Sequence, residues 1–230
     1  MDGRDQDAPM PQAAWLHEET AFKEGFERVA GVDEAGRGPL AGPVVSAAVI
    51  LPADFSVCGV TDSKRLTPSR RNSLYDEIYG KALSIGIGIV DPVEIDRINI
   101  LQASLTAMAI AVENLSPQPD FILVDGNYAI SPGVFMKQPR RFNQKPIVGG
   151  DLKSVSIAAA SIVAKVTRDR IMAAYHVDYP EFGFPGHKGY ATRAHLEAIA
   201  VHGCCPIHRR TFRKGGGDGF RQQALFVSSS

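Results

Sequence analysis

Short apolar runs, separated by polar and glycine- or proline-rich segments, set the pattern of this chain. Residues 29–32 and 43–51 are rich in valine and alanine, and residues 82–90 alternate apolar residues with glycine. Each of these runs predicts a hairpin-type strand. Residues 121–124 are apolar throughout, as in a central parallel strand buried on both faces. Residues 147–151 predict a brief strand or turn.

Helix-start signals lie between and after these strands. A hydroxyl or carboxylate cap followed by proline begins residues 67–79 and residues 91–115, the second with a break near Asn99. The alanine-rich residues 153–175 predict a long helix, and residues 192–201 predict a further helix closed by glycine. Strands that alternate with helices predict an α/β fold, with helices flanking a mixed sheet and the last helices forming a small cap.

The length of 230 residues suits one large domain or two small ones. Residues 1–27 are polar and proline-dotted and are expected to form a flexible tail. Residues 215–230 are rich in glycine and serine and are expected to be disordered. The domain between these tails would span residues 28–214, with the helical cap at about 176–214.

Composition points to a globular, reduced, cytosolic protein. Hydrophobic residues make up 44% of the chain, and no apolar run reaches the roughly 18 residues that a membrane helix needs. The acidic N-terminus lacks an apolar signal core, so export is not expected. Three cysteines, two of them adjacent, do not make a disulfide framework.

Charge is divided unevenly along the chain, although the net charge is zero. Residues 1–136 hold 10 Lys and Arg against 19 Asp and Glu, a net of −9, and residues 137–230 hold 15 against 6, a net of +9. Such a split provides acids for cations and a basic half for phosphates. Chance segregation together with an acidic tail is the alternative interpretation.

Four carboxylates share one kind of position. Each ends or follows an apolar run next to glycine or other small residues: Asp33, Glu34, Asp125 and Asp151. Side chains at strand ends converge in open α/β sheets, and four carboxylates there would hold two magnesium or manganese ions about 4 Å apart, as in phosphodiester hydrolysis. Glycines on both sides of Arg37 would let a phosphate backbone come close. This set suggests a hydrolase acting on nucleic acid.

Purely structural interpretations of the same residues stay open. A single Asp after a strand is more often a turn or cap residue, and Asp151 could simply cap the helix that starts near residue 153. Neighbours on a strand point to opposite faces, so Asp33 and Glu34 share a site only if the strand ends between them. A zinc site among the histidines and cysteines of residues 187–208 is not favoured, because the sequence has no CxxC pair.

Six motifs spread over roughly residues 28–213 follow a known pattern: GVDEAGRGPLAGPVV at 31–45, DSKRL at 62–66, ILVDGN at 122–127, GDLKSVSIAAASIVAKVTRDR at 150–170, YPEFGFPGHKGYAT at 179–192 and HRRTF at 208–212. In these motifs the chain resembles bacterial ribonuclease HII, the type 2 ribonuclease H. The resemblance implies an RNase H-like mixed sheet flanked by helices, with a small C-terminal helical extension. It also implies a monomeric cytoplasmic enzyme of DNA replication and repair.

The activity implied by the resemblance is endonucleolytic hydrolysis of the RNA strand of RNA–DNA hybrids, and cutting on the 5′ side of single ribonucleotides embedded in duplex DNA. The products would carry a 3′-hydroxyl and a 5′-phosphate, and the reaction would use two divalent ions, Mg²⁺ or Mn²⁺. The family's metal-binding acids fall on the four carboxylates named above. Its loop that reads the ribose 2′-hydroxyl falls on Gly36, Arg37 and Gly38, and its junction-sensing tyrosine falls on Tyr190.

Further contacts to the substrate are less specific. Four residues are candidates for phosphate contacts, although each could equally be a solvated surface residue: Lys64, Ser154, Lys188 and Arg193. Residues 127–146 predict a long loop, whose part around 133–145 is basic with interleaved aromatic residues and is longer than the family usually has. An added nucleic-acid contact and a mobile surface insertion are both open for it.

Two other functions compete with this interpretation. A catalytically silent hybrid-binding module would be favoured by the loss of an acid, and all four acids are present. Another RNase H-like nuclease, such as a DNA strand-transfer or junction enzyme, is disfavoured by the Gly-Arg-Gly loop and the tyrosine, because both serve ribonucleotide sensing in the resembled family.

Overall fold

A five-stranded mixed sheet forms the centre of the computed structural model, in the order β3-β2-β1-β4-β5. The structure describes residues 15–56, 59–60, 63, 66–135 and 141–212. The strands are β1 (Val29–Ala35), β2 (Val44–Ile50), β3 (Ser84–Val90), β4 (Phe121–Asp125) and β5 (Asn143–Ile147). The β1–β2 and β2–β3 pairs are antiparallel, whereas the β1–β4 and β4–β5 pairs are parallel. The predicted mixed sheet is confirmed.

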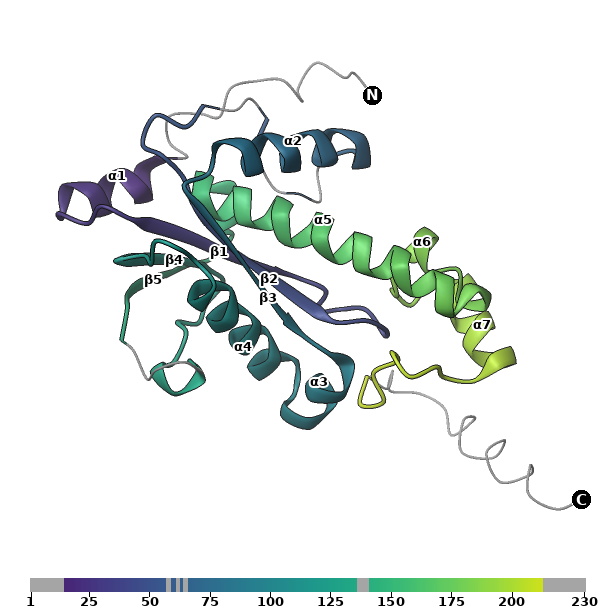
Figure 1. Ribbon diagram of the computed structural model, residues 1–230. Coiled ribbons are helices and arrows are strands. Elements are labelled where there is room, and N and C mark those ends of the chain that lie inside the picture. Colours follow the sequence, from purple (N-terminus) through teal and green to yellow (C-terminus); the bar gives the residue numbers. More distant parts are fainter. Residues whose placement is uncertain (1–14, 57–58, 61–62, 64–65, 136–140, 213–230) are drawn as a thin grey trace, which may run out of the picture.

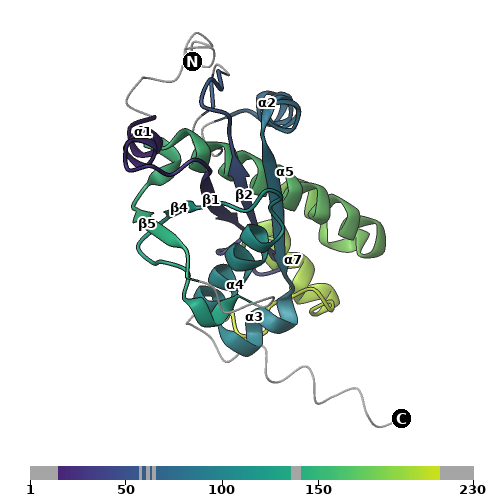
Figure 2. The ribbon, with the colours of Figure 1, turned by 60° about the vertical axis from the view of Figure 1, so that its left-hand side comes forward.

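Helices cover both faces of the sheet (Figures 1 and 2). Helices α5 (Val155–Asp178) and α2 (Pro68–Lys81) lie on one face, and α4 (Ile100–Glu113) lies on the other, preceded by α3 (Pro92–Ile98) (Figure 1). One apolar cluster joins β2 to α2 and α5, and a second joins β1, β2 and β4 to α4. Strand β2 is buried along its whole length, and Ser46 is its one polar residue.

Glycines in two strands let these helices approach the sheet closely. A β-carbon on Gly31 would collide with the backbone of Ser156 in α5. A β-carbon on Gly88 would collide with the carbonyl oxygen of Ala107 in α4. The alternating glycines of β3 therefore provide the surface on which α4 packs.

The helix starts follow the cap signals in the sequence. Thr67 caps α2 and Asp91 caps α3, each accepting a hydrogen bond from the backbone N–H three residues later. Asn99 has a φ of 68° between α3 and α4, and its side chain accepts hydrogen bonds from the first turn of α4. The predicted break in this helical segment is therefore confirmed.

Strand β5 corrects the predicted boundaries of the segment that follows β4. Residues 127–146 were expected to be a loop and residues 147–151 a brief strand or turn. The strand instead occupies Asn143–Ile147, and a turn follows it at residues 148–149. It is an edge strand in which Ile147 alone is fully buried, so its sequence, NQKPI, carries almost no apolar signal.

Helix α1 (Leu16–Lys23) lies within residues 1–27, which were predicted to form a flexible tail. Its Glu18 is 1% exposed, and one carboxylate oxygen accepts hydrogen bonds from the Ser154 hydroxyl at 2.5 Å and the Ser156 backbone N–H at 3.0 Å. The tail prediction is wrong for this helix, because a buried carboxylate ties it to the start of α5.

The C-terminal extension packs against the last turns of α5 (Figure 1). It contains η6 (Pro180–Phe182), α6 (Phe184–His187) and α7 (Arg193–His202). Its buried cluster joins Met172 of α5 to Phe184 and Ile199. Among the described residues, no helix has the length and apolar character that would let it span a membrane.

Candidate active site

A pocket of about 250 Å³ opens where the carboxyl ends of β1 and β4 meet α5 and the C-terminal extension. Seven of the predicted site residues line it: Asp33, Glu34, Gly36, Arg37, Gly38, Asp125 and Tyr190. They come from three separate stretches of the chain. Because β1 and β4 are parallel neighbours, Asp33 and Asp125 leave the sheet at the same edge.

Asp33 and Glu34 both line the pocket, although β1 continues through Ala35. The prediction that the strand must end between them is therefore wrong. The Glu34 backbone N–H donates a hydrogen bond to the Asp33 Oδ1 at 2.7 Å. This bond holds one Asp33 carboxylate oxygen beside the backbone of Glu34, and both acids line the pocket.

The electrostatics of the pocket centre on Asp33, which is only 6% exposed. Burial raises the pKa of the Asp33 carboxyl well above its usual range, and the nearby Glu34 and Asp125 raise it further. A hydrogen bond from Ser161 opposes this effect only in part. The Arg37 Nη1 is 3.2 Å from the Glu34 Oε1. The site therefore holds negative charge that a proton or a bound cation would stabilise.

Asp125 is held by the turn that precedes α5. The Gly150 backbone N–H donates to the Asp125 Oδ1 at 2.7 Å. Asp151 follows in the short helix η5 (Gly150–Leu152) and is 8% exposed, but it does not line the pocket. Within the described residues, no three His, Cys, Asp or Glu side chains are grouped as ligands of one metal ion. The structure thus brings three acids to one pocket and places the fourth beside it.

The Gly36–Gly38 loop and Tyr190 line the same pocket. Gly36 has a φ of 100°, a conformation that favours glycine. A β-carbon on Gly38 would lie 3.6 Å from the Tyr190 ring, so the loop backbone and this ring are neighbours. Tyr190 is 45% exposed between α6 and α7, which leaves its ring accessible.

Of the four predicted phosphate-binding residues, the three that the structure describes do not line this pocket. Lys64 is outside the described residues. Ser154 is fully buried, where it caps α5 and bonds to Glu18, so the structure does not bring it to the site. Lys188 is partly exposed, with its carbonyl oxygen bound by Arg168. Arg193 is exposed and pairs with Glu197 at 2.7 Å.

The aromatic residues of the basic segment 133–145 belong to the core. Phe135, which follows the short helix η4 (Pro132–Val134), is 5% exposed and packs against Phe142 with ring centroids 5.1 Å apart. Residues 136–140 of this segment lie outside the described part of the chain. An aromatic stacking surface at Phe135 is therefore not available in this structure.

Besides Ala35, four polar lining residues were not predicted: Ser63, Ser161, Lys165 and Arg168. Three of them share one face of α5, because positions 161, 165 and 168 are four and three residues apart. The Ser161 and Ser63 hydroxyls lie 2.9 Å apart, and the Lys165 Nζ is 2.6 Å from the Asp169 Oδ1. Polar residues repeated at intervals of three and four in an otherwise alanine-rich helix are the sequence signal that could have predicted the three α5 residues.

Comparison with known proteins relates this geometry to one family. Residues 30–215 match the model of the ribonuclease HII family. The chain is 56% identical over 205 residues to ribonuclease HII of Geobacter sulfurreducens, covering 89% of this chain and 90% of that protein. Among solved structures, ribonuclease H2 from Pyrococcus horikoshii is 30% identical with a TM-score of 0.66, and the alignment covers 81% of this chain and 94% of that one. RNase HII in a PCNA complex from Archaeoglobus fulgidus is 25% identical with a TM-score of 0.68, covering 83% and 98%. The chain therefore belongs to the ribonuclease HII family, a family of endonucleases.

Proposed function

We propose that this protein hydrolyses the RNA strand of RNA–DNA hybrids and cuts on the 5′ side of single ribonucleotides embedded in duplex DNA. Membership of the ribonuclease HII family supports RNA-strand endonuclease activity on hybrids. The observation that carries the finer proposal is the position of the Gly36–Gly38 loop and Tyr190 beside the acids Asp33, Glu34 and Asp125 in one pocket. Cleavage would leave a 3′-hydroxyl and a 5′-phosphate.

The donor chemistry of the pocket fits two hard divalent cations, Mg²⁺ or Mn²⁺, because these ions prefer carboxylate oxygens. Asp33, Glu34 and Asp125 would hold them, with Asp151 joining from the adjacent η5 turn. The raised pKa of Asp33 supports this assignment, since its ionised form lacks sufficient compensation from the surrounding protein. When bound, such ions lower the pKa of the attacking water and neutralise charge on the leaving oxygen.

The chain's own residues would orient and recognise the substrate. Backbone N–H groups of Glu34 and Gly150 hold the Asp33 and Asp125 carboxylates in place, at 2.7 Å in both cases. The backbone of the Gly36–Gly38 loop would contact the ribose 2′-hydroxyl, the one group that distinguishes RNA from DNA at a single position. The Tyr190 ring would pack on the neighbouring sugar.

The basic half of the chain would contact the substrate's phosphates without reading sequence. Lys64, Lys188 and Arg193 stay candidates for this role, whereas the burial of Ser154 removes it from direct contact. We also propose a monomeric protein of the cytoplasm that acts in DNA replication and repair. The few cysteines are consistent with a reducing compartment.

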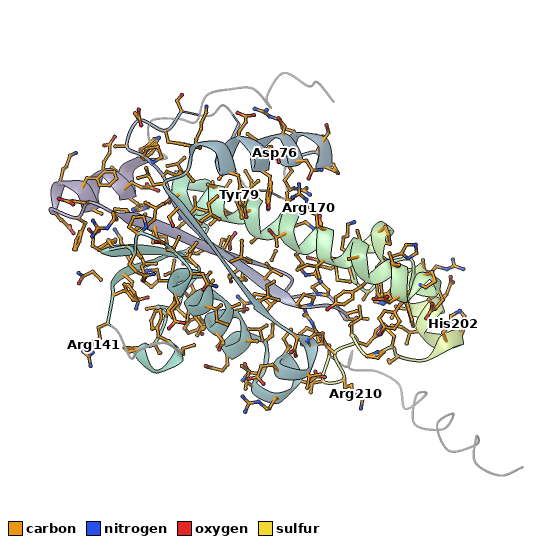
Figure 3. The ribbon with its side chains drawn as sticks, viewed as in Figure 1. Asp76, Tyr79, Arg141, Arg170, His202 and Arg210 are labelled. Carbon is orange, nitrogen blue, oxygen red and sulfur yellow. The ribbon has the colours of Figure 1, made fainter. Side chains whose placement is uncertain are left out.

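Cleavage of a DNA duplex that carries one ribonucleotide tests the proposal. Wild-type protein should cut only with Mg²⁺ or Mn²⁺, on the 5′ side of the ribonucleotide. Asp33→Asn should lower the rate by at least about 100-fold, because it removes a metal ligand. Asp76→Asn is the matched control, since Asp76 is exposed on α2 (Figure 3).

Three outcomes would contradict the proposed function. Equal cutting by the wild type and Asp33→Asn would remove Asp33 from the chemistry. Cutting in the presence of EDTA would exclude the metal requirement. Tight binding of hybrid without any cleavage would instead support the silent binding module.

A further inference from the structure

The segment after α7 returns to the loop between β1 and β2 and places a buried arginine there, Arg209. The Arg209 side chain is directed into this loop, and the residue is only 4% exposed. Its Nη2 donates to the Gly36 carbonyl oxygen at 2.6 Å, and its Nη1 donates to the Arg37 carbonyl oxygen at 3.0 Å. Its Nε donates to the Gly42 carbonyl oxygen at 2.9 Å. One guanidinium group thus holds both ends of the loop.

These bonds determine which way the loop presents its N–H groups. In a trans peptide the C=O and the following N–H point in opposite directions. When the Gly36 and Arg37 carbonyl oxygens point toward Arg209, the N–H groups of Arg37 and Gly38 point away from it. The loop residues Gly36, Arg37 and Gly38 all line the pocket.

Arg168 binds the same loop as a second buried guanidinium. Its Nε donates to the Pro43 carbonyl oxygen and its Nη2 to the Ala41 carbonyl oxygen, both at 3.0 Å. Burial and the neighbouring Arg168 lower the pKa of Arg209 to about 9. Burying a charge is costly unless it is well hydrogen-bonded, and an apolar side chain would fill the space at less cost. The burial of two hydrogen-bonded guanidinium groups, those of Arg168 and Arg209, therefore favours a role for them in shaping the loop.

His208, the residue before Arg209, reaches Tyr190 through a second histidine. The Cys205 backbone N–H donates to the His208 Nδ1 at 3.0 Å, so the His208 proton is on Nε2. That N–H donates to the His195 Nε2 at 3.0 Å. The His195 Nδ1 then carries a proton and donates to the Tyr190 carbonyl oxygen at 2.9 Å. Both rings are buried, His195 completely.

We infer that His208 and Arg209 act together as positioning residues for ribonucleotide recognition. Arg209 orients the Gly36–Gly38 backbone, and His208 holds Tyr190 through His195, so two consecutive residues set the spacing between the loop and the ring. This inference rests on the proposed function, in which these two elements recognise the ribonucleotide. It assigns the C-terminal extension a direct part in substrate discrimination.

Arg209→Lys tests the Arg209 half of the inference. Lysine keeps the positive charge but cannot form the forked contact to several carbonyl oxygens. The measured quantity is the ratio of two affinities in EDTA: that for a duplex with one ribonucleotide and that for the same duplex made only of DNA. Any loss of folded protein affects both affinities equally and cancels in the ratio. Thermal unfolding and cleavage of the single-ribonucleotide duplex by the wild type are recorded in parallel.

The ratio should fall about 3- to 10-fold in Arg209→Lys, the effect of losing one or two net hydrogen bonds. Arg210→Lys is the control, because Arg210 is the exposed neighbour of Arg209 (Figure 3). His208→Asn should also lower the ratio, whereas His208→Gln should restore it, since the glutamine amide can donate where the His208 Nε2 does.

Wild-type ratios in both Arg209→Lys and His208→Asn would overturn the inference. A wild-type protein that cuts the single-ribonucleotide duplex while the variants keep full discrimination defeats the inference alone. A wild-type protein that neither cuts nor prefers that duplex defeats the proposed function, and the inference with it.

Discussion

Asp33 links the electrostatics of one side chain to the stability of the whole protein. Its pKa is raised by burial and then by Glu34 and Asp125. A carboxyl whose pKa is higher in the folded than in the unfolded state stabilises the fold below its unfolded pKa. That contribution is lost as the pH rises through the folded value. In metal-free protein, the ionised Asp33 is therefore a source of instability at neutral pH.

Replacing Asp33 with Asn should stabilise the metal-free protein. We expect Asp33→Asn to raise the free energy of unfolding at pH 8, because asparagine carries no charge that must be buried beside Glu34 and Asp125. The gain should shrink as the pH falls toward about 4, the pKa of an unfolded Asp. Urea unfolding in EDTA at pH 8 and pH 5 measures this. A gain of equal size at both pH values would contradict it.

At the scale of elements, close contact between helix and sheet depends on glycines, and the C-terminal extension depends on buried histidines. Gly88 lies against the backbone of α4, whereas Gly80 in α2 has space for a β-carbon. His208 packs against Phe182 and His195, next to Cys205 and Arg209, and His187 is near enough to interact with it electrostatically. The packing of Gly88 and the packing of His208 each lead to a separate prediction.

Gly88→Ala should destabilise the protein by about 1–3 kcal/mol, the usual cost of forcing an atom into a packed interface. Gly80→Ala adds the same methyl group to an exposed helix position and should stabilise by about 0.5–1 kcal/mol, because alanine favours the helix. Chemical denaturation of both variants measures the difference. Equal effects of the two substitutions would show that α4 does not pack against β3 as described.

Acid should weaken the C-terminal extension through His208. Burial, together with the neighbouring His195 and His187, lowers the pKa of His208 to about 4. A histidine whose folded pKa is depressed contributes stability above its unfolded pKa of about 6.5, and loses it as the pH falls toward the folded value. His208→Gln should flatten the decline in unfolding temperature between pH 7 and pH 4. Parallel curves for the wild type and the variant would refute this role.

At the scale of the whole molecule, α1 joins the start of the chain to the helix that carries the site. Glu18 accepts hydrogen bonds from Ser154 and Ser156 at the N-terminus of α5, where a carboxylate also interacts favourably with the helix dipole. Asp151 lies in the η5 turn just before this point. The N-terminal helix thus supports the turn next to the pocket, although it contributes no lining residue among those described.

Glu18→Ala should lower the free energy of unfolding by about 1–3 kcal/mol, because two buried serine hydroxyls lose their acceptor. Glu24→Ala, an exposed change just after α1, should have an effect within about 0.5 kcal/mol. Thermal unfolding of the two variants gives the comparison. If Glu18→Ala unfolds like the wild type, α1 does not anchor the start of α5.

Several features of the fold and site follow from local sequence. The caps at Thr67 and Asp91 and the break at Asn99 depend on residues within one helical turn, so the sequence predicts them correctly. The mixed sheet with flanking helices follows from the order of apolar runs. The pairing of acids with small residues at strand ends marks candidate site positions without showing that they meet.

Local sequence therefore determines most of the helices and strands and the chemical character of the site. Only the tertiary structure decided the edge strand β5, the docking of α1 through Glu18, and the approach of Arg209 to the Gly36 carbonyl across 173 positions of the chain. The physical reason is the separation along the chain between the residues that interact. Caps and periodic patterns involve neighbours a few residues apart, whereas burial of a polar group and its partner depends on surfaces that exist only after the chain has folded.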